Sequence, residues 1–204
     1  ALGEYSSALE ETRADLFGLY YLADPKMVEL GIVPDMEAYK AQYSSFIRNG
    51  IFTQFTRVEL GKKNMESHMQ DRKLIAQWCY EKGLADNVIE KKVRDGKTYF
   101  VVNDFEALRG LFGDLLAEVQ RIKSEGDYEA GKALVENYAV NIDYDLHKEV
   151  LERYSSLGLK PYGGFLNPEI VPVEKNGEIV DYELVYADGY IDQMLQYGRD
   201  YSTL

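Results

Sequence analysis

The sequence has few of the residues that form metal sites and covalent cross-links. Its 204 residues include only two histidines, His68 and His147, and one cysteine, Cys79. Because the two histidines lie far apart, the chain has no H-E-x-x-H arrangement, in which two zinc-binding histidines share one helix face. A lone cysteine forms neither an intramolecular disulfide nor a cysteine metal cluster. A metal site in this chain would therefore depend on carboxylates.

Positive charge and long apolar runs are also scarce. The chain has 23 Lys and Arg residues against 35 Asp and Glu, which gives a formal net charge of −12. This balance repels phosphate backbones and anionic membrane surfaces, so we expect no nucleic-acid partner and no membrane partner. No apolar run approaches the ~20 residues needed to span a bilayer. The low cysteine content is typical of a reducing compartment, and we expect a cytoplasmic location.

The length and the periodicity of apolar residues predict a mainly α fold with two small β-hairpins, built as a single mostly helical domain over 1–204. Asp95-Gly96 and Asn176-Gly177 are strong hairpin-turn signals between alternating apolar segments. The predicted strands are 88–93, 97–102, 169–175 and 178–186. Helical spacing predicts helices over about 5–22, 35–58, 64–82, 103–126, 128–138, 146–157 and 188–200.

Several local features carry more specific expectations. Gly50 interrupts an apolar stripe and predicts a bend in its helix, and Asn103 with Glu106 predicts a capping pair. The apolar segment 16–23 indicates a helix buried on nearly all sides. Cys79 lies on an amphipathic helix and is expected to be a buried, inert thiol. His147, between Leu146 and a lysine, is expected to be a solvated surface histidine without a role.

An acidic segment, Leu9-Glu10-Glu11-Thr12-Arg13-Ala14-Asp15, opens the first predicted helix. Glu11 and Asp15 share one face because residues four apart in a helix are neighbours. A carboxylate drawn toward the interior costs several kcal/mol unless a cation, a metal or hydrogen bonds compensate it. The segment therefore predicts either a metal-binding carboxylate or a helix terminus whose acids complement the dipole, with Arg13 paired to a neighbour.

Two blocks of this sequence resemble motifs of the dipeptidyl peptidase III family, which consists of zinc exopeptidases that release dipeptides from peptide N-termini. Glu10-Glu11-Thr12-Arg13-Ala14-Asp15 resembles the family's EExxAD/E motif. Ser67-His68-Met69-Gln70-Asp71-Arg72 resembles its substrate-contacting HMQxR helix, in the same order and at a similar separation. A weaker match continues over most of the chain. The resemblance implies the C-terminal part of the helical zinc-binding lobe of a two-lobed metallopeptidase.

The resemblance also implies roles for five residues. Glu11 corresponds to the zinc-binding carboxylate, and Glu10 and Asp15 to acids that orient the zinc-binding histidines. His68 corresponds to a catalytic side chain that donates to the substrate carbonyl as negative charge develops on it. Arg72 corresponds to a residue that binds or orients the peptide. The implied cofactor is zinc and the implied partners are oligopeptide substrates and the rest of the parent enzyme.

The family's HExxGH helix, which supplies two zinc-binding histidines and the catalytic glutamate, has no counterpart in this chain. We therefore expect a fragment whose zinc site is incomplete, and the first residue, Ala1, is not an initiator methionine. Lys160, in a glycine-rich loop, is one candidate for holding the substrate's far carboxylate. Two other hypotheses remain open: a metal-free peptide-binding module, and a helical interaction domain in which the acidic cluster is structural.

Overall fold

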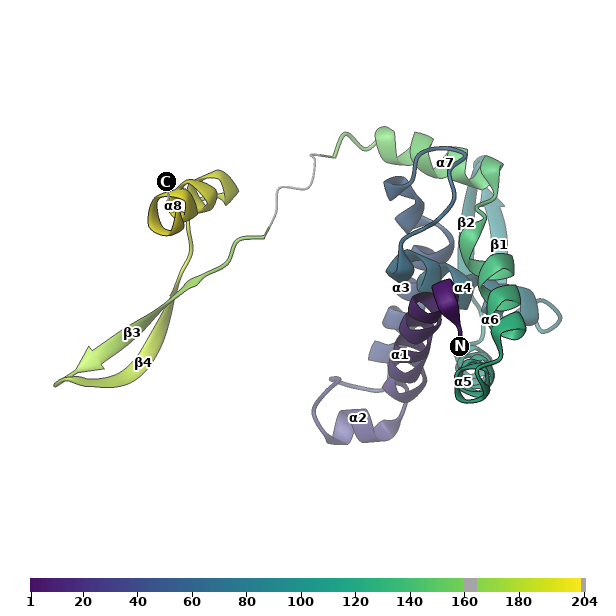
Figure 1. The fold of residues 1–204 in the computed structure, drawn as a ribbon, viewed down its shortest axis with the longest axis horizontal. Helices are drawn as coiled ribbons and strands as arrows, with labels where there is room; N and C mark the ends of the chain where they lie inside the picture. Colours follow the sequence, from purple (N-terminus) through teal and green to yellow (C-terminus); the bar gives the residue numbers. More distant parts are fainter. Residues whose placement is uncertain (160–164, 203–204) are drawn as a thin grey trace. The chain divides into compact units, whose positions relative to one another are not determined.

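The computed structural model describes residues 1–159 and 165–202. The chain divides into two compact units, Ala1–Leu157 and Gly158–Leu204, which are described separately below (Figure 1). Helices dominate, and the described strands form two antiparallel two-stranded sheets, so the predicted fold class is confirmed. That residues 1–204 make up a single domain stays a prediction.

The first unit contains seven α-helices, a β-hairpin and three short helical turns. In chain order its elements are η1 (Gly3–Tyr5), α1 (Ser6–Leu22), α2 (Pro25–Glu29), α3 (Ala38–Ile51), η2 (Thr53–Arg57), α4 (Ser67–Lys82), β1 (Ile89–Arg94), β2 (Lys97–Val102), α5 (Phe105–Glu125), α6 (Tyr128–Val135), the π-helical η3 (Glu136–Val140) and α7 (Tyr144–Ser155). The helix α2 was not among the predicted helices, and Asp24 caps it ahead of Pro25.

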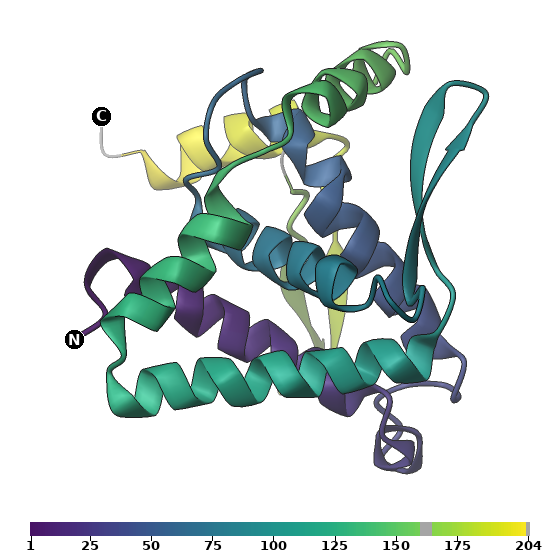
Figure 2. The same cartoon turned by 90° about the vertical axis from the view of Figure 1, so that its right-hand side faces the viewer.

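The core of this unit forms where α1, α4 and α5 meet and where α3 crosses α4 (Figure 2). Leu9 and Leu16 of α1, Ile75 of α4, and Phe112 and Leu115 of α5 are fully buried there. Burial of one such side chain contributes roughly 1.5–3 kcal/mol. This packing fixes α1 beside α4, and these two helices carry the two motif segments.

Gly50 explains how α3 approaches α4 so closely. A Cβ added at Gly50 would lie 2.2 Å from the carbonyl oxygen of Arg72 and 2.7 Å from Cβ of Ala76. The helix ends at Ile51, directly after Gly50, and the chain continues as the turn η2, so the long helix predicted over 35–58 is broken beside this residue. The absence of a side chain serves a helix–helix contact, which the sequence of α3 alone could not reveal.

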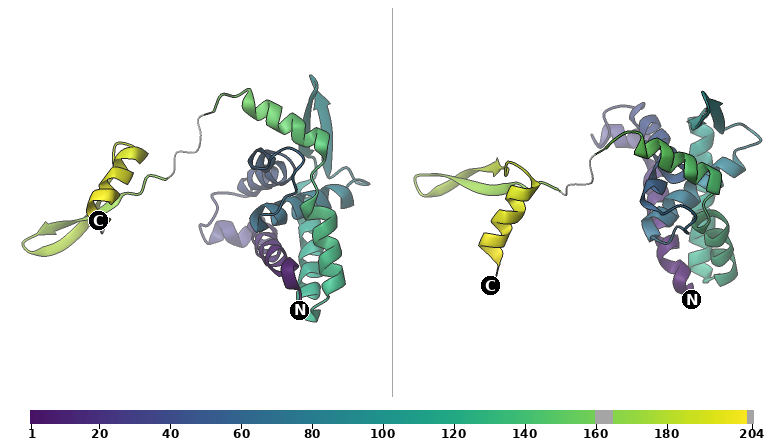
Figure 3. Two further views of the ribbon diagram at one scale, coloured as in Figure 1. Left: turned by 45° about the horizontal axis from the view of Figure 1, so that its top comes forward. Right: turned by 90° about the horizontal axis from the view of Figure 1, so that it is seen from above.

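The first hairpin, β1–β2, has the predicted turn. Arg94 pairs with Lys97, and Asp95 and Gly96 between them have φ values of 50° and 70°. Positive φ at both central residues is the geometry that favours Asp-Gly in two-residue hairpin loops. The hairpin projects beside the helices (Figures 2 and 3), and Arg153 of α7 donates to the carbonyl of Thr98 on its second strand.

Two local expectations about caps and burial are wrong. The N-cap of α5 is Asp104, whose side chain accepts from the backbone N–H of Ala107, whereas Asn103 donates to the carbonyl of Asn87. The second half of α1 is not buried on nearly all sides, because the side chains of Phe17 and Tyr21 are largely exposed. These two side chains border α5 without being covered by it.

His147 is buried, so its expected surface position is also wrong. Its Nε2 lies 3.1 Å from the carbonyl oxygen of Phe55 and 3.0 Å from that of Val58. The ring therefore ties α7 to the segment after α3. The neighbours of His147 in sequence are compatible with solvent exposure, and only the packing of a distant loop over α7 buries it. Cys79 is fully buried, as expected, and burial raises the pKa of its thiol.

The second unit contains β3 (Glu169–Lys175), β4 (Glu178–Val185) and α8 (Tyr190–Tyr201), drawn in green to yellow in Figure 3. Asn176 and Gly177 form its predicted turn, with φ values of 57° and 84°. Gln193 of α8 is buried and accepts from the backbone N–H of Asn167. The candidate Lys160 lies outside the described residues. In the part of the chain that the structure describes, no helix has the length and apolar character needed to cross a membrane.

Candidate metal and peptide site

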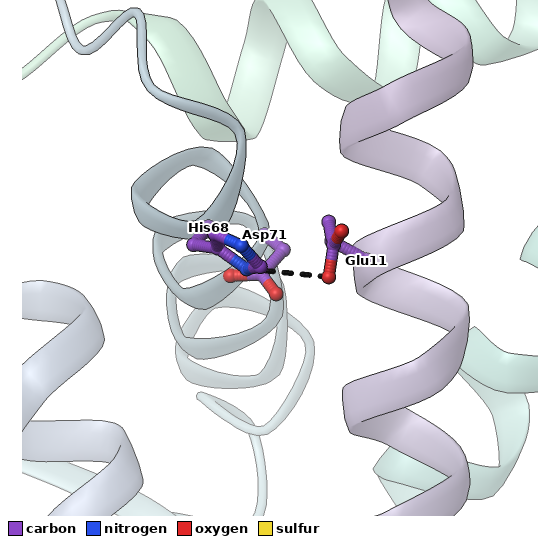
Figure 4. Close-up of side chains that lie close together, drawn as sticks. All are labelled: Glu11, His68 and Asp71. Atoms are coloured by element: carbon purple, nitrogen blue, oxygen red, sulfur yellow. Dashed lines mark ion pairs between the residues drawn. The ribbon is translucent and has the colours of Figure 1, made fainter.

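The packing of α1 on α4 brings the two motif segments together. Oε2 of Glu11 on α1 lies 3.2 Å from Nδ1 of His68 on α4 (Figure 4). The two residues are 57 positions apart in the sequence, so the contact depends on the tertiary structure. It places the acid predicted to bind metal directly against the histidine predicted to act on substrate.

His68 occupies the first turn of α4 because Glu66 begins that helix. The Glu66 side chain accepts from the backbone N–H groups of His68 and Met69, at 3.1 and 3.0 Å. An acid at this position satisfies free N–H groups and complements the positive end of the helix dipole. The cap fixes the start of the helix, and the His68 side chain remains 57% exposed to solvent. Its ring is thus anchored at the backbone and open on one side.

Asp71 is the third member of the cluster. Its side chain is completely buried, and its carboxyl group is hydrogen-bonded to that of Asp15. One of these oxygens, Nδ1 or Nε2 of His68 and a Glu11 oxygen all lie within 4.8 Å of one another. Asp71 follows His68 by three residues and therefore faces the same side of α4 (Figure 4).

A second carboxyl, that of Asp15, lies beside Asp71. Burial and, to a smaller extent, the neighbouring Asp15 carboxyl raise the pKa of Asp71 to about 8, and the Arg72 charge opposes the shift. Two adjacent carboxyl groups can be bonded to each other only when one of them carries a proton, because like charges at this distance repel. Asp15 thus lies one helical turn after Glu11 on α1 and beside the buried acid on α4.

Asp15 and Arg72 also line a polar cavity of about 480 Å³ between α1, α3 and α4. Arg48 and Asn49 of α3 and Thr53 line the same cavity. The cavity therefore presents two guanidinium groups and the amides of Gln42 and Asn49, and its wall includes Asp15, which lies one helical turn after Glu11. Guanidinium groups bind carboxylates and peptide carbonyls through several N–H donors, so the cavity suits a polar, peptide-like ligand.

Glu10 points elsewhere. It forms ion pairs with Arg13 on its own helix and with Lys123 on α5, where its Oε2 lies 2.7 Å from the lysine Nζ. Hydrogen bonds from Arg13 and Lys123 lower the pKa of Glu10 to about 2. The structure therefore brings Glu11, Asp15, His68 and Arg72 to one region and leaves Glu10 on the α5 side of α1. Arg13 is paired with Glu10. This pairing was expected if the acidic segment is a helix terminus whose acids complement the dipole.

Sequence reasoning missed Asp71. Its spacing of three residues from His68 was a usable signal, since it places both side chains on one helix face. The burial of Asp71 could not be read from that spacing, because it comes from α1 packing over α4. The missing information was which face of α4 meets the acidic segment.

The donor set at this site can hold a divalent cation. It offers two carboxylates and one imidazole, which are ligands of borderline metals such as zinc. A cation would also compensate the carboxylates of Asp15 and Asp71 once the proton between them had left. The fold and the site together define a mainly helical protein with a candidate metal site.

The family comparison agrees with that class. Residues 1–183 match the model of peptidase family M49, the dipeptidyl peptidase III family. Because the match covers most of the chain, this chain belongs to peptidase family M49, a family of zinc metallopeptidases. The match ends within β4 and does not include α8. No match was found among curated proteins.

Proposed function

We propose that this chain is the C-terminal part of the catalytic region of a zinc-dependent dipeptidyl peptidase, an exopeptidase that cleaves dipeptides from peptide N-termini. The observation that carries the proposal is the contact between Glu11 and His68, which joins the two motifs that the resemblance assigned to metal and substrate. Membership of family M49 supports the same reaction class. The location that we propose is cytoplasmic.

The residues present fit a zinc ion in part. Glu11 is one-third exposed and offers a free carboxylate oxygen beside an imidazole, but the two histidines of an HExxGH helix are absent from this sequence. A hydrolytic zinc site uses three protein ligands and an open position. We therefore propose that Glu11 is one ligand and that the remainder of the parent enzyme supplies the others. Zinc, when bound, would activate a water molecule and polarise the scissile carbonyl.

The other residues have roles that follow from their positions. The Nδ1 atom of His68 faces Glu11, which leaves Nε2 to donate to the scissile carbonyl oxygen as negative charge develops on it. Arg72, on the cavity wall next to Asp15, would hold the peptide backbone or a substrate carboxylate. We propose that Asp15 orients a metal-binding histidine of the parent enzyme. Glu10 could take the same role only after breaking its ion pair with Lys123.

An apolar groove is the place we propose for contact with the rest of the enzyme. Phe17, Tyr20 and Tyr21 of α1 and Leu116 of α5 line a groove of about 600 Å³ on the face away from the core. Phe17 is 56% exposed. Contiguous apolar surfaces of this kind are uncommon on monomers and mark interfaces. Helices of the parent lobe that carry the missing histidines would cover such a surface.

The proposal is tested by zinc content and dipeptide release, measured on this chain and on a version extended upstream in its native reading frame. We expect only the extended protein to release dipeptides. In that protein, Glu11→Ala should abolish stoichiometric zinc binding, because a ligand is lost. Glu129→Ala, which removes an exposed acid on α6, is the matched control and should retain both properties. Full zinc content in the Glu11→Ala protein would remove Glu11 from the site.

A further inference from the structure

A small cavity bordered by α3, α4 and the start of α7 contains a buried lysine that the proposed peptidase reaction does not use. The cavity has a volume of about 210 Å³. We propose that Lys73 in this cavity is a reactive amine that forms imines with small, uncharged aldehydes. The proposal goes beyond the proposed function and is independent of it, because no residue that lines this cavity has a role in the peptidase reaction.

The lining of the cavity is buried at its floor and polar and exposed at its mouth. Ile51 of α3 and Phe55 of η2 are 3% and 1% exposed, and Lys73 of α4 is 5% exposed. Asn137 and Asn141 line the same cavity and are exposed. Sites for small molecules commonly combine an apolar floor with a few polar groups. Among the buried lining residues, the ionisable group is the amine of Lys73.

The Lys73 amine has no charged partner. In the part of the chain that the structure describes, its Nζ forms no ion pair and donates a hydrogen bond to the carbonyl oxygen of Tyr138 at 2.9 Å. Burial without a counter-charge favours the neutral amine, and it lowers the pKa of Lys73 to about 8. A neutral amine keeps its lone pair, and desolvated lysines of this kind are nucleophiles toward carbonyl compounds. The amine is thus held in place and reactive.

Two carboxylates at the mouth of the cavity select against anionic ligands. Glu81 and Asp143 line the cavity and are exposed. Glu81 accepts from the hydroxyl of Tyr138 at 2.9 Å, and Asp143 accepts from the backbone N–H of Leu146 at 2.8 Å, so both acids have their own partners. Negative charge at an entrance repels carboxylates and phosphates. This charge and the volume of the cavity together favour a small, uncharged aldehyde.

Imine formation at Lys73 needs no further reactant. The lone pair of Nζ forms a bond to the carbonyl carbon of the aldehyde, and the π electrons of the carbonyl move to its oxygen. A proton passes from the nitrogen to that oxygen, and the loss of water from the resulting carbinolamine leaves a C=N bond. The net change converts amine and aldehyde to imine and water, without oxidation or reduction. The protonated imine keeps one N–H, which can donate to the Tyr138 carbonyl as the amine does.

Reductive alkylation of the 204-residue chain tests the proposal. The chain is treated at pH 7.5 with acetaldehyde and sodium cyanoborohydride, which reduces an imine to an ethylated lysine, and the rate at each lysine is measured by peptide mass spectrometry. At this pH roughly a quarter of amines with a pKa of 8 are neutral, against about one in a thousand at the ordinary value of 10.5. We expect Lys73 to be ethylated at least ~10-fold faster than Lys82, which lies at the exposed end of the same helix.

Unfolding and substitution provide the controls. In guanidinium chloride the burial of Lys73 is lost, so Lys73 and Lys82 should react at similar rates. In a Lys73→Met chain the fast phase of ethylation should disappear, and its persistence would assign the fast reaction to another lysine and overturn the proposal. A rate at Lys73 no higher than that at Lys82 in the folded parent chain would also overturn it, as would a preference for Lys73 that persists after unfolding.

Discussion

At the scale of single residues, His68 gives the sharpest test of the proposed reaction. In the complete enzyme, His68→Ala should lower kcat by roughly 10²–10³-fold, the usual effect of removing one donor to a developing oxyanion. The effect should fall on kcat more than on KM, because the interaction strengthens in the transition state. Zinc content, measured in parallel by atomic absorption, should not change, since the proposed zinc-binding histidines lie outside this chain. An unchanged kcat would exclude this role.

Lys73, the residue after Arg72, gives a pH-dependent prediction. It is buried, its Nζ donates to the carbonyl of Tyr138 at 2.9 Å, and burial lowers its pKa to about 8. Between pH 8 and the ordinary value of 10.5, the unfolded chain binds a proton that the folded chain does not. The free energy of unfolding should therefore rise with pH across this window, by up to a few kcal/mol in total.

Urea unfolding at pH 7.5 and pH 9.5 measures this contribution as the difference between the parent chain and Lys73→Met. As the pH rises, the free energy of unfolding of the parent chain should increase relative to that of Lys73→Met. Lys82→Met at the exposed end of α4 is the matched control. Its free energy of unfolding should differ from that of the parent chain by the same amount at both pH values. A constant difference between the parent chain and Lys73→Met would mean that the lysine keeps its ordinary pKa in the folded state.

At the scale of elements, the crossing of α3 and α4 determines where Arg72 lies. Gly50→Ala would place a methyl group 2.2 Å from the Arg72 carbonyl oxygen, so the helices must separate. Overpacking of this kind typically costs about 1–3 kcal/mol of stability. We expect a lower midpoint of thermal unfolding and, in the complete enzyme, a raised KM as Arg72 moves.

Gly110→Ala on α5 is the control for this substitution. A Cβ at Gly110 would meet no atom within 4 Å, and alanine in a helix interior is favoured over glycine by roughly 0.5–1 kcal/mol. Calorimetry should therefore show the two substitutions shifting the unfolding midpoint in opposite directions. If the unfolding midpoint of Gly50→Ala equals or exceeds that of the parent chain, α3 and α4 can accommodate a methyl group at this position without separating.

At the scale of the whole molecule, the two units should differ in local stability. The first unit buries a continuous apolar core, whereas nearly every apolar side chain described in β3, β4 and α8 is exposed. An isolated two-stranded hairpin is at best marginally stable in water. Backbone amides of β3 and β4 should therefore exchange with deuterium orders of magnitude faster than those of α1, α4 and α5. Comparable protection in both units, measured by mass spectrometry, would contradict this expectation.

The exposed apolar surfaces also predict self-association. The apolar groove lined by Phe17, Tyr20, Tyr21 and Leu116 and the side chains of the β3–β4 hairpin both lack cover within their own unit. We expect concentration-dependent oligomers of this chain in analytical ultracentrifugation, and less association in the upstream-extended protein, whose added helices would cover the groove. Equal behaviour of the two proteins would argue against the groove as the contact surface.

The sequence by itself determined the elements and the family. Turn pairs such as Asp95-Gly96 specify a hairpin because their backbone needs positive φ, and the 3.6-residue apolar period specifies α5, because both signals are local. The motif segments around Glu11 and His68 were readable for the same reason. The tertiary structure alone decided three further features: the contact between Glu11 and His68, the burial of Asp71 and His147, and the role of Gly50. Burial depends on which helix faces meet, and a residue's neighbours in sequence do not contain that information.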